Sequence, residues 1–260
     1  MAGVKRYERY VAIGDSSTEG LDDPDGRGRY RGWADRFAER VARSQGSLLY
    51  ANLAIRGRST RQVRDQQLQP ALQLRPDLAT VFAGTNDVVS RRFDPTRVAA
   101  DLEEMQSTLI SAGATVLSIN LPDLSPVMPM ARLLRERIER LNSEIRRVCR
   151  ETGAVLVDLA AYPVASDPRL WSDDRLHANS AGHARIAWAL AEALEIPDTP
   201  DGWADPLPPS PPPRLTEAIT AEARWIGRYL APWIWRHLWG RSSGDELDPK
   251  RPELTSVVSE

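Results

Sequence analysis

A serine, an aspartate and a histidine in this chain have the residue types and local spacing that nucleophilic catalysis requires. Ser16 ends a Gly-Asp-Ser tripeptide directly after a short apolar run, and Asp174 precedes His177 by three residues. A serine hydroxyl is a weak nucleophile until a neighbouring base takes its proton, and the pKa of histidine suits that role. An aspartate three residues away in a turn can reach the imidazole and select its tautomer. These residues together predict acyl transfer through a serine.

Acyl transfer also needs hydrogen-bond donors for the negative charge that develops on the carbonyl oxygen. Gly57 follows a second apolar run and Asn86 follows a third. The backbone N–H groups of Ser16 and Gly57 and the side-chain amide of Asn86 are the candidate donors, and glycine lets a substrate approach the backbone closely. Taken singly, Gly57 and Asn86 are equally compatible with simple turns.

Apolar runs alternate with helical patterns along the first two hundred residues. The expected strands are residues 10–13, 48–55, 77–83, 114–121 and 154–159, and the expected helices are residues 33–42, a stretch capped by Ser59 and Gln62, residues 94–111, 130–151 and about 180–194. This order predicts a flavodoxin-like three-layer α/β/α sandwich with a five-stranded, doubly wound parallel sheet. Because the carboxyl ends of parallel strands meet at one edge, the residues that follow them converge there.

Four blocks in this order resemble the SGNH hydrolase family, also called GDSL esterases and lipases: Gly14-Asp-Ser16, Gly57, Gly84-Thr-Asn86-Asp87 and Asp174-x-x-His177. The resemblance covers about residues 7–195. It implies that Ser16 is the nucleophile, His177 the general base and acid, and Asp174 the orienting carboxylate. It also implies an oxyanion hole made by the Ser16 and Gly57 N–H groups and the Asn86 amide. Ser17 stands where the family commonly has Leu or Ile, which bears on substrate preference.

The resemblance predicts a cofactor-independent esterase that forms an acyl-enzyme at Ser16, with short-chain acyl esters as the first expectation for its small-molecule substrate. Lysophospholipids and O-acetylated sugars are alternatives within the family's range. A flavodoxin-like module that binds a small ligand without catalysis is the alternative from another class, although a binder needs no such set of residues. A third possibility is an interaction protein with a vestigial hydrolase domain.

Arginines flank two of the predicted oxyanion turns. Four guanidinium groups there could attract an anionic ester (Arg56, Arg58, Arg91 and Arg92). Only two of the 34 basic residues are lysines, however. A chain so rich in arginine places arginines in loops regardless of function, and we favour that simpler reading.

Other polar residues fit structural roles better than catalytic ones. Asp173 has the wrong spacing to replace Asp174, and Asp15 and Asp87 are expected to brace loops. The single cysteine, Cys149, falls on the apolar side of a helical pattern, and His183 is expected to be a packing or surface histidine. The sequence shows no group of residues with metal-ligand spacing, so we expect no metal.

Composition divides the chain into four parts. We expect a hydrolase domain at residues 1–196, a proline-rich linker at 197–214, a tryptophan-rich amphipathic helical segment at 215–240 and a polar, disordered tail at 241–260. Half of the eight tryptophans lie in the third part (Trp225, Trp233, Trp235 and Trp239). This segment is expected to pack on its own domain, with a homodimer contact or a peripheral membrane contact as alternatives.

The net charge of −2 gives no reason to expect a nucleic-acid partner. The chain shows no signal-peptide pattern and no apolar run near the ~20 residues of a membrane span, so we expect a cytoplasmic protein.

Overall fold

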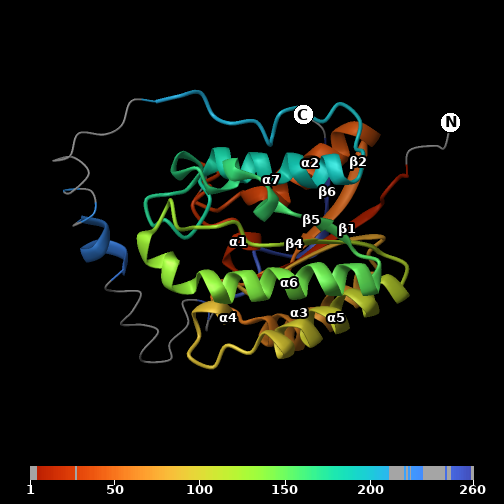
Figure 1. Cartoon of the computed structure of the whole chain (residues 1–260). Coiled ribbons are helices and arrows are strands. Elements are labelled where there is room, and N and C mark those ends of the chain that lie inside the picture. The colour runs from red at the N-terminus through yellow and green to blue at the C-terminus, as the bar shows by residue number, and fades with distance from the viewer. Residues whose placement is uncertain are drawn as a thin grey trace.

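The computed structural model describes residues 5–26, 28–210, 220, 222, 224–230, 244 and 247–258. A six-stranded sheet lies between two layers of helices (Figure 1). Its strands are β1 (Arg9–Gly14), β2 (Ser47–Asn52), β3 (Leu78–Phe82), β4 (Thr115–Ile119), β5 (Val155–Val157) and β6 (Arg251–Val258). Their order is β5-β4-β3-β1-β2-β6; the first five strands are parallel, and β6 is antiparallel to β2.

Helices cover both faces of this sheet, which confirms the three-layer prediction. α2 (Gly32–Gln45) and α7 (Ser180–Ala193) pack together on one face, and α3 (Thr60–Gln73), α5 (Pro95–Ser111) and α6 (Arg135–Thr152) lie on the other (Figure 1). Two short helices, α1 (Ser16–Glu19) and α4 (Thr85–Val89), follow β1 and β3. Four 3₁₀ turns complete the body: η1 (Pro129–Leu134), η2 (Leu159–Ala161), η3 (Pro163–Ser166) and η4 (Pro168–Leu170).

The predicted helix boundaries follow from the capping residues. Ser59 and Gln62 form the reciprocal capping box at the start of α3, with the Ser59 N–H donating to Gln62 Oε1 at 3.0 Å. Asp94 accepts from the first N–H groups of α5, and Asn179 does the same for α7. Gly153 ends α6 in the left-handed conformation.

Two adjacent strands, β1 and β3, form the switch point of the doubly wound sheet, because β2 lies on one side of them and β4 on the other. Gly14 at the end of β1 leaves no room for a Cβ atom, which would collide with the Phe82 carbonyl oxygen and the Thr18 hydroxyl. This close approach puts the loops after β1 and β3 side by side. Cys149 is buried in the same core, as predicted.

The C-terminal strand β6 corrects the predicted sheet of five strands and, for residues 251–258, the disorder predicted for the tail at 241–260. Residues 251–258 pair with β2 in antiparallel register, for example Val258 with Ser47. Lys250 anchors the start of the strand, because its Nζ lies 2.9 Å from Asp35 Oδ1 and donates to the Arg31 carbonyl at 2.7 Å. The polar residues of β6 give no apolar run that would predict a strand. Such an edge strand pairs with its neighbour through backbone groups.

The first part of the predicted linker at 197–214 packs on the body of the protein. Trp203 is only 6% exposed, belongs to the main core and donates from Nε1 to Glu192 Oε2 at 2.8 Å. Residues just beyond α7 therefore pack on the body of the protein.

Part of the predicted tryptophan-rich helix is described as a short π-helical turn, η5 (Ile226–Leu230), preceded by the buried Trp225. Trp233, Trp235 and Trp239 lie outside the described residues. Within the described part of the chain, no helix has both the length and the apolar character needed to cross a membrane.

Candidate active site

Ser16, His177 and Asp174 form a continuous series of hydrogen bonds. Ser16 opens α1 directly beyond β1, and its Oγ lies 2.8 Å from His177 Nε2. The other ring nitrogen, His177 Nδ1, lies 2.6 Å from Asp174 Oδ2. A proton on Nδ1 leaves Nε2 free to accept the proton of the Ser16 hydroxyl.

The loop from Ser172 to His177 folds so that Asp174 faces the imidazole. The second carboxylate oxygen, Asp174 Oδ1, accepts from the backbone N–H groups of Leu176 at 2.8 Å and His177 at 3.0 Å. The Ser172 N–H donates to the His177 carbonyl at 2.9 Å and closes the turn. Asp173 is exposed and has no described contact, which agrees with the spacing argument for Asp174.

The electrostatics of the pair favour an ionised aspartate beside a basic histidine. Burial would raise the pKa of Asp174, but its hydrogen bond to His177 and the histidine's charge hold that pKa well below its usual value. Burial would lower the pKa of His177, but the Asp174 hydrogen bond and charge, together with Asp22 and Asp15, raise it above its usual value. Such a histidine is a stronger base toward Ser16.

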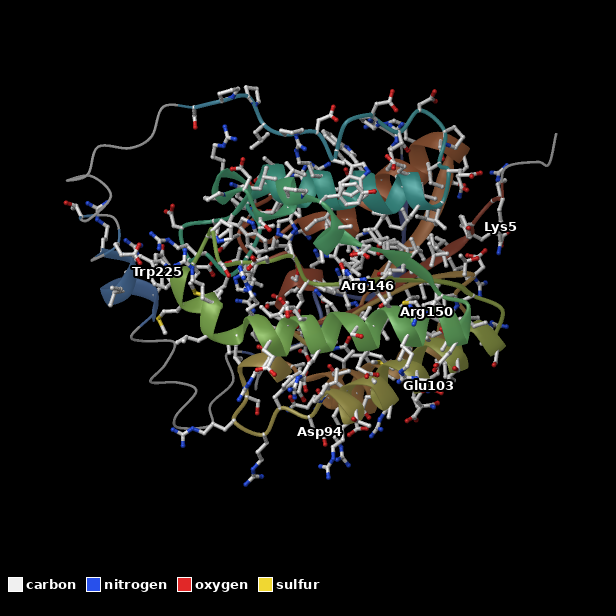
Figure 2. All side chains as sticks on the ribbon, viewed as in Figure 1. Lys5, Asp94, Glu103, Arg146, Arg150 and Trp225 are labelled. Atoms are coloured by element: carbon white, nitrogen blue, oxygen red, sulfur yellow. The ribbon has the colours of Figure 1, made fainter. Side chains whose placement is uncertain are left out.

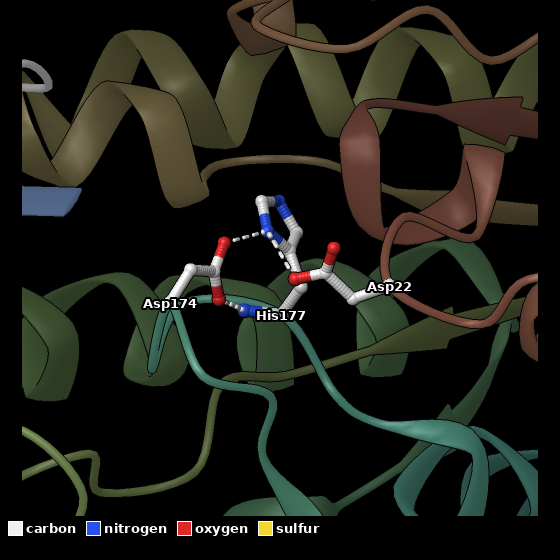
Figure 3. Close-up of side chains that lie close together, drawn as sticks. All are labelled: Asp22, Asp174 and His177. Carbon is white, nitrogen blue, oxygen red and sulfur yellow. Dashed lines mark hydrogen bonds and ion pairs between the residues drawn. The ribbon is translucent and has the colours of Figure 1, made fainter. Parts of the chain in front are cut away.

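A second carboxylate, that of Asp22, lies beside the same imidazole (Figure 3). Asp22 Oδ2 is 4.0 Å from His177 Nδ1, and Ser172 Oγ lies 2.5 Å from Asp22 Oδ2 and 2.6 Å from Asp174 Oδ1. The Ser172 hydroxyl has one proton, so it can donate a hydrogen bond to only one of these two carboxylates. Burial and the charge of Asp174 raise the pKa of Asp22, so this carboxyl group takes up a proton at a higher pH than a free aspartate does.

Asp22 and Ser172 were not predicted from the sequence. They lie 150 positions apart in two irregular loops, and neither belongs to a short motif. Only the fold brings them together.

Asp22, Asp174 and His177 are also the described residues closest to a metal-ligand set, with one ligand atom from each lying within 4.8 Å of the others. Both nitrogens of the imidazole are already engaged, one with Ser16 and one with Asp174. A metal ion at this position would have to break the Asp174–His177 hydrogen bond. We therefore interpret the cluster as a hydrogen-bonded network.

The three predicted oxyanion donors line the same cavity as Ser16 and His177. Ser16 is the first residue of α1, so its N–H has no partner within the helix. Gly57 adopts the left-handed conformation, with φ of 74°, and its N–H has no acceptor among the described residues. Asn86 differs, because its Nδ2 donates both to Asp15 Oδ2 at 3.1 Å and to the Arg58 carbonyl at 3.0 Å. Donation to an oxyanion requires Asn86 to share or release one of these bonds.

Buried carboxylates brace the loops around these donors. Asp15 accepts from the Ser17 N–H and from Asn86, and burial raises the pKa of Asp15 to about 7. Asp87 accepts from the backbone N–H and the hydroxyl of Thr60, both at 2.8 Å, and so joins α4 to α3. These contacts are the bracing roles expected for both aspartates.

The cavity has a volume of about 1210 Å³, and the four predicted arginines do not share one position around it. Arg56 lines it but forms an ion pair with Glu19, to which its backbone N–H also donates at 2.9 Å. Arg58 is buried outside the lining and donates to the Gly244 carbonyl at 3.1 Å. Arg91 and Arg92 line the cavity and are exposed, with no carboxylate partner among the described residues.

His183 is buried beneath the loop that carries Asp22. Its Nδ1 accepts from the Trp33 N–H at 3.1 Å, and its Nε2 donates to the Leu21 carbonyl at 2.9 Å. Burial lowers the pKa of His183 to about 4, which keeps the ring neutral. The structure thus makes it a packing histidine, one of the two roles considered.

A three-layer α/β/α sandwich with serine, histidine and aspartate in hydrogen-bonded series beyond parallel strands defines a serine hydrolase. Residues 12–185 match the GDSL-like Lipase/Acylhydrolase family. Since the match covers more than half of the chain, the protein belongs to this family and is an ester-bond hydrolase. No curated protein sequence matches the chain.

Solved structures of hydrolases share the fold. LAE5, an alpha/beta hydrolase enzyme from the metagenome of Lake Arreo, Spain, is 22% identical, with a TM-score of 0.63 over 75% of this chain and 99% of LAE5. TesA is 19% identical, with a TM-score of 0.60 over 72% of this chain and 98% of TesA. A catalytic mutant of Axe2, an acetylxylan esterase from Geobacillus stearothermophilus, is 16% identical, with a TM-score of 0.61 over 77% of this chain and 97% of Axe2.

Proposed function

We propose that the enzyme hydrolyses carboxylic esters with small or short acyl groups through an acyl-enzyme at Ser16. The observation that carries this proposal is the hydrogen-bonded series from Ser16 Oγ through His177 to Asp174. A binding module without catalysis has no use for a serine hydroxyl held on a histidine whose far side faces an ionised carboxylate.

In the proposed first step, His177 Nε2 takes the Ser16 proton while Oγ attacks the ester carbonyl carbon. The carbonyl oxygen becomes an oxyanion, for which the N–H groups of Ser16 and Gly57 and the Asn86 amide are the donors. The intermediate collapses as the carbon–oxygen bond to the alcohol breaks, and His177 gives its proton to the departing alcohol. The acyl group then remains on Ser16.

In the second step, His177 takes a proton from water, and the resulting hydroxide attacks the acyl carbonyl. Collapse of this intermediate releases the carboxylic acid and returns the proton to Ser16. Asp174 remains ionised throughout and stabilises the imidazolium each time it forms.

Among the proteins with similar structures, AlAXEase and Axe2 are acetylxylan esterases by name, which is compatible with a small acyl group. Their low identity supports the fold alone, so the acyl group here rests on the sequence argument, and acetylated sugars stay a second candidate substrate.

The direct test compares the wild-type enzyme with Ser16→Ala on p-nitrophenyl esters of graded acyl length and on an acetylated sugar. We expect a wild-type rate at least about 10³-fold above that of Ser16→Ala, with an optimum at short acyl chains. Equal rates for the two proteins across the whole series would reject the esterase mechanism. An optimum at long chains would reject the short-acyl preference only.

A further inference from the structure

A short segment far beyond the family match contacts the loop that carries Asp174 and His177. Trp225 lies forty positions after residue 185, where the match ends, yet it is only 4% exposed. Its indole Nε1 donates to the backbone carbonyl of Asp174 at 3.0 Å. In Figure 2 the labelled Trp225 lies at the end of the molecule where α6 begins, opposite Arg150 at the other end of that helix.

Arg175, which directly follows Asp174 in the catalytic loop, contacts two residues of this segment. Its guanidinium lies over the Trp225 ring at 4.6 Å, and its Nη1 is 2.6 Å from Glu222 Oε2. Arg175 has a φ of 61°, a left-handed conformation that costs energy for a residue other than glycine. These two contacts of the side chain support that conformation, and with it the turn between Asp174 and His177.

The same segment extends the apolar lining of the active-site cavity. Trp225 packs with Met128 and Ala131 in a small second core, and three partly buried residues pack against that core (Leu124, Leu176 and Tyr229). All three of those residues line the cavity that contains Ser16 and His177. We call Leu124, Leu176 and Tyr229 the apolar wall.

The proposed mechanism indicates which part of an ester meets this wall. The carbonyl oxygen must face the oxyanion donors, whereas the oxygen of the departing alcohol must reach His177 Nε2 to receive its proton. The alcohol part of the ester therefore leaves the reacting carbon on the histidine side. The apolar wall lies on that side, because Leu176 precedes His177 directly and Tyr229 belongs to the segment docked on Asp174.

We propose that the apolar wall binds the alcohol part of the substrate, that Tyr229 selects esters of apolar alcohols, and that Trp225 is a positioning residue for the Asp174–His177 loop. This proposal rests on the proposed esterase function. It names the substrate class as short-chain acyl esters of apolar alcohols, and it makes Glu222, Trp225 and Tyr229 part of the functional enzyme.

The test of the wall uses acetate esters of linear alcohols that increase by one methylene at a time. We expect the wild-type kcat/KM to rise along the series, by at most about fourfold for each methylene that leaves water. Tyr229→Ala should flatten that rise mainly through KM, because the lost contact is made equally in the ground state and the transition state. Ile226→Ala is the matched control, since Ile226 lies in the same turn, is 45% exposed and does not line the cavity.

The test of Trp225 uses Trp225→Phe, which keeps an aromatic ring for packing and for the Arg175 guanidinium but removes the indole N–H. We expect a severalfold fall in kcat for every ester in the series, with KM and the dependence on alcohol length unchanged. Trp225→Ala, measured below its unfolding temperature, should show a larger fall in kcat.

These outcomes separate the wall from the esterase function. If the wild-type enzyme hydrolyses no ester, the proposed function fails. If the wild type is active and Tyr229→Ala keeps the same slope as Ile226→Ala, the wall is refuted. A change confined to a series of varied acyl groups, with the alcohol constant, also refutes it. An unchanged kcat in Trp225→Phe refutes the positioning role.

Discussion

The two sides of the active site are built in different ways. The nucleophile side is part of the sheet, because Ser16 follows β1 and Asn86 follows β3, and these two central strands are paired with each other. The histidine side is an irregular loop between η4 and α7, and side chains from other parts of the chain hold it. Asp22 reaches it through Ser172, and Trp225 reaches it through the Asp174 carbonyl.

The charged groups near the reacting residues also differ between the two sides. The carboxylates of Asp22 and Asp174 lie beside the His177 imidazole, whereas the exposed guanidiniums of Arg91 and Arg92 line the cavity just after α4, the helix that carries Asn86. A site of this kind has a fixed nucleophile opposite a base whose position and pKa depend on tertiary contacts. We therefore expect loss of an oxyanion donor on the nucleophile side to lower kcat, and a change of charge beside His177 to shift the pH dependence of activity.

The largest effect is expected on the nucleophile side, from Asn86→Ala. Loss of an oxyanion donor should lower kcat by about 10²- to 10³-fold and change KM little. The change also leaves the buried Asp15 Oδ2 without its Asn86 donor, so a moderate loss of stability is expected as well. Steady-state kinetics well below the unfolding temperature separate the two effects. A fall in kcat of less than tenfold would show that the two backbone N–H groups suffice.

This division also explains what could be predicted from the sequence. Strand ends and helix caps are local, so the alternation of strands and helices along the chain, the Ser59 capping box and the convergence of Ser16, Gly57, Asn86 and His177 were all accessible from residue patterns. Asp174 was accessible because its spacing to His177 is local too. The distances and hydrogen-bond partners of these residues could be obtained only from the structure.

The features that escaped prediction depend on contacts between distant parts of the chain. β6 is rich in polar residues, and it joins the sheet through backbone pairing with β2 and the Lys250 anchor. Trp203 lies in a proline-rich stretch whose composition is typical of a linker, yet it packs into the core. Arg58 follows Gly57 directly but does not line the cavity, because its guanidinium donates to the Gly244 carbonyl. This contact lies far away in the sequence and could not be predicted from a local pattern.

A smaller effect, and one of a different kind, is expected on the histidine side from Asp22→Asn. An ionised carboxylate at Asp22 stabilises the imidazolium and raises the pKa of His177. His177 must be neutral to accept the Ser16 proton, so activity rises as pH increases through that pKa. Removal of the Asp22 charge lowers the pKa, and the acidic limb of kcat/KM should shift to lower pH.

Asparagine at position 22 can still donate to Ser172 Oγ, so the loop geometry is retained in this variant. Asp173→Asn is the matched control, because it removes the same charge from an exposed neighbour of Asp174. The pH profile of kcat/KM for both variants is the measurement. If the two acidic limbs coincide with that of the wild type, Asp22 carries a proton throughout and does not tune His177.

The smallest effect is expected on the nucleophile side, from removal of its exposed positive charges. Arg91 and Arg92 lack a carboxylate partner among the described residues, whereas Arg56 is neutralised by Glu19, so of these three arginines the first two are better placed to favour an anionic ester. We expect Arg91→Ala and Arg92→Ala each to lower the ratio of kcat/KM for an anionic ester to that for a neutral one by about two- to fivefold. Added salt should remove that difference, because exposed charges are screened.

Arg97→Ala is the control, since Arg97 is 81% exposed, pairs with Asp94 and does not line the cavity. A ratio that is the same in all three variants would mean that these arginines reflect only the composition of the chain, and that charge on the nucleophile side plays no part in choosing the ester.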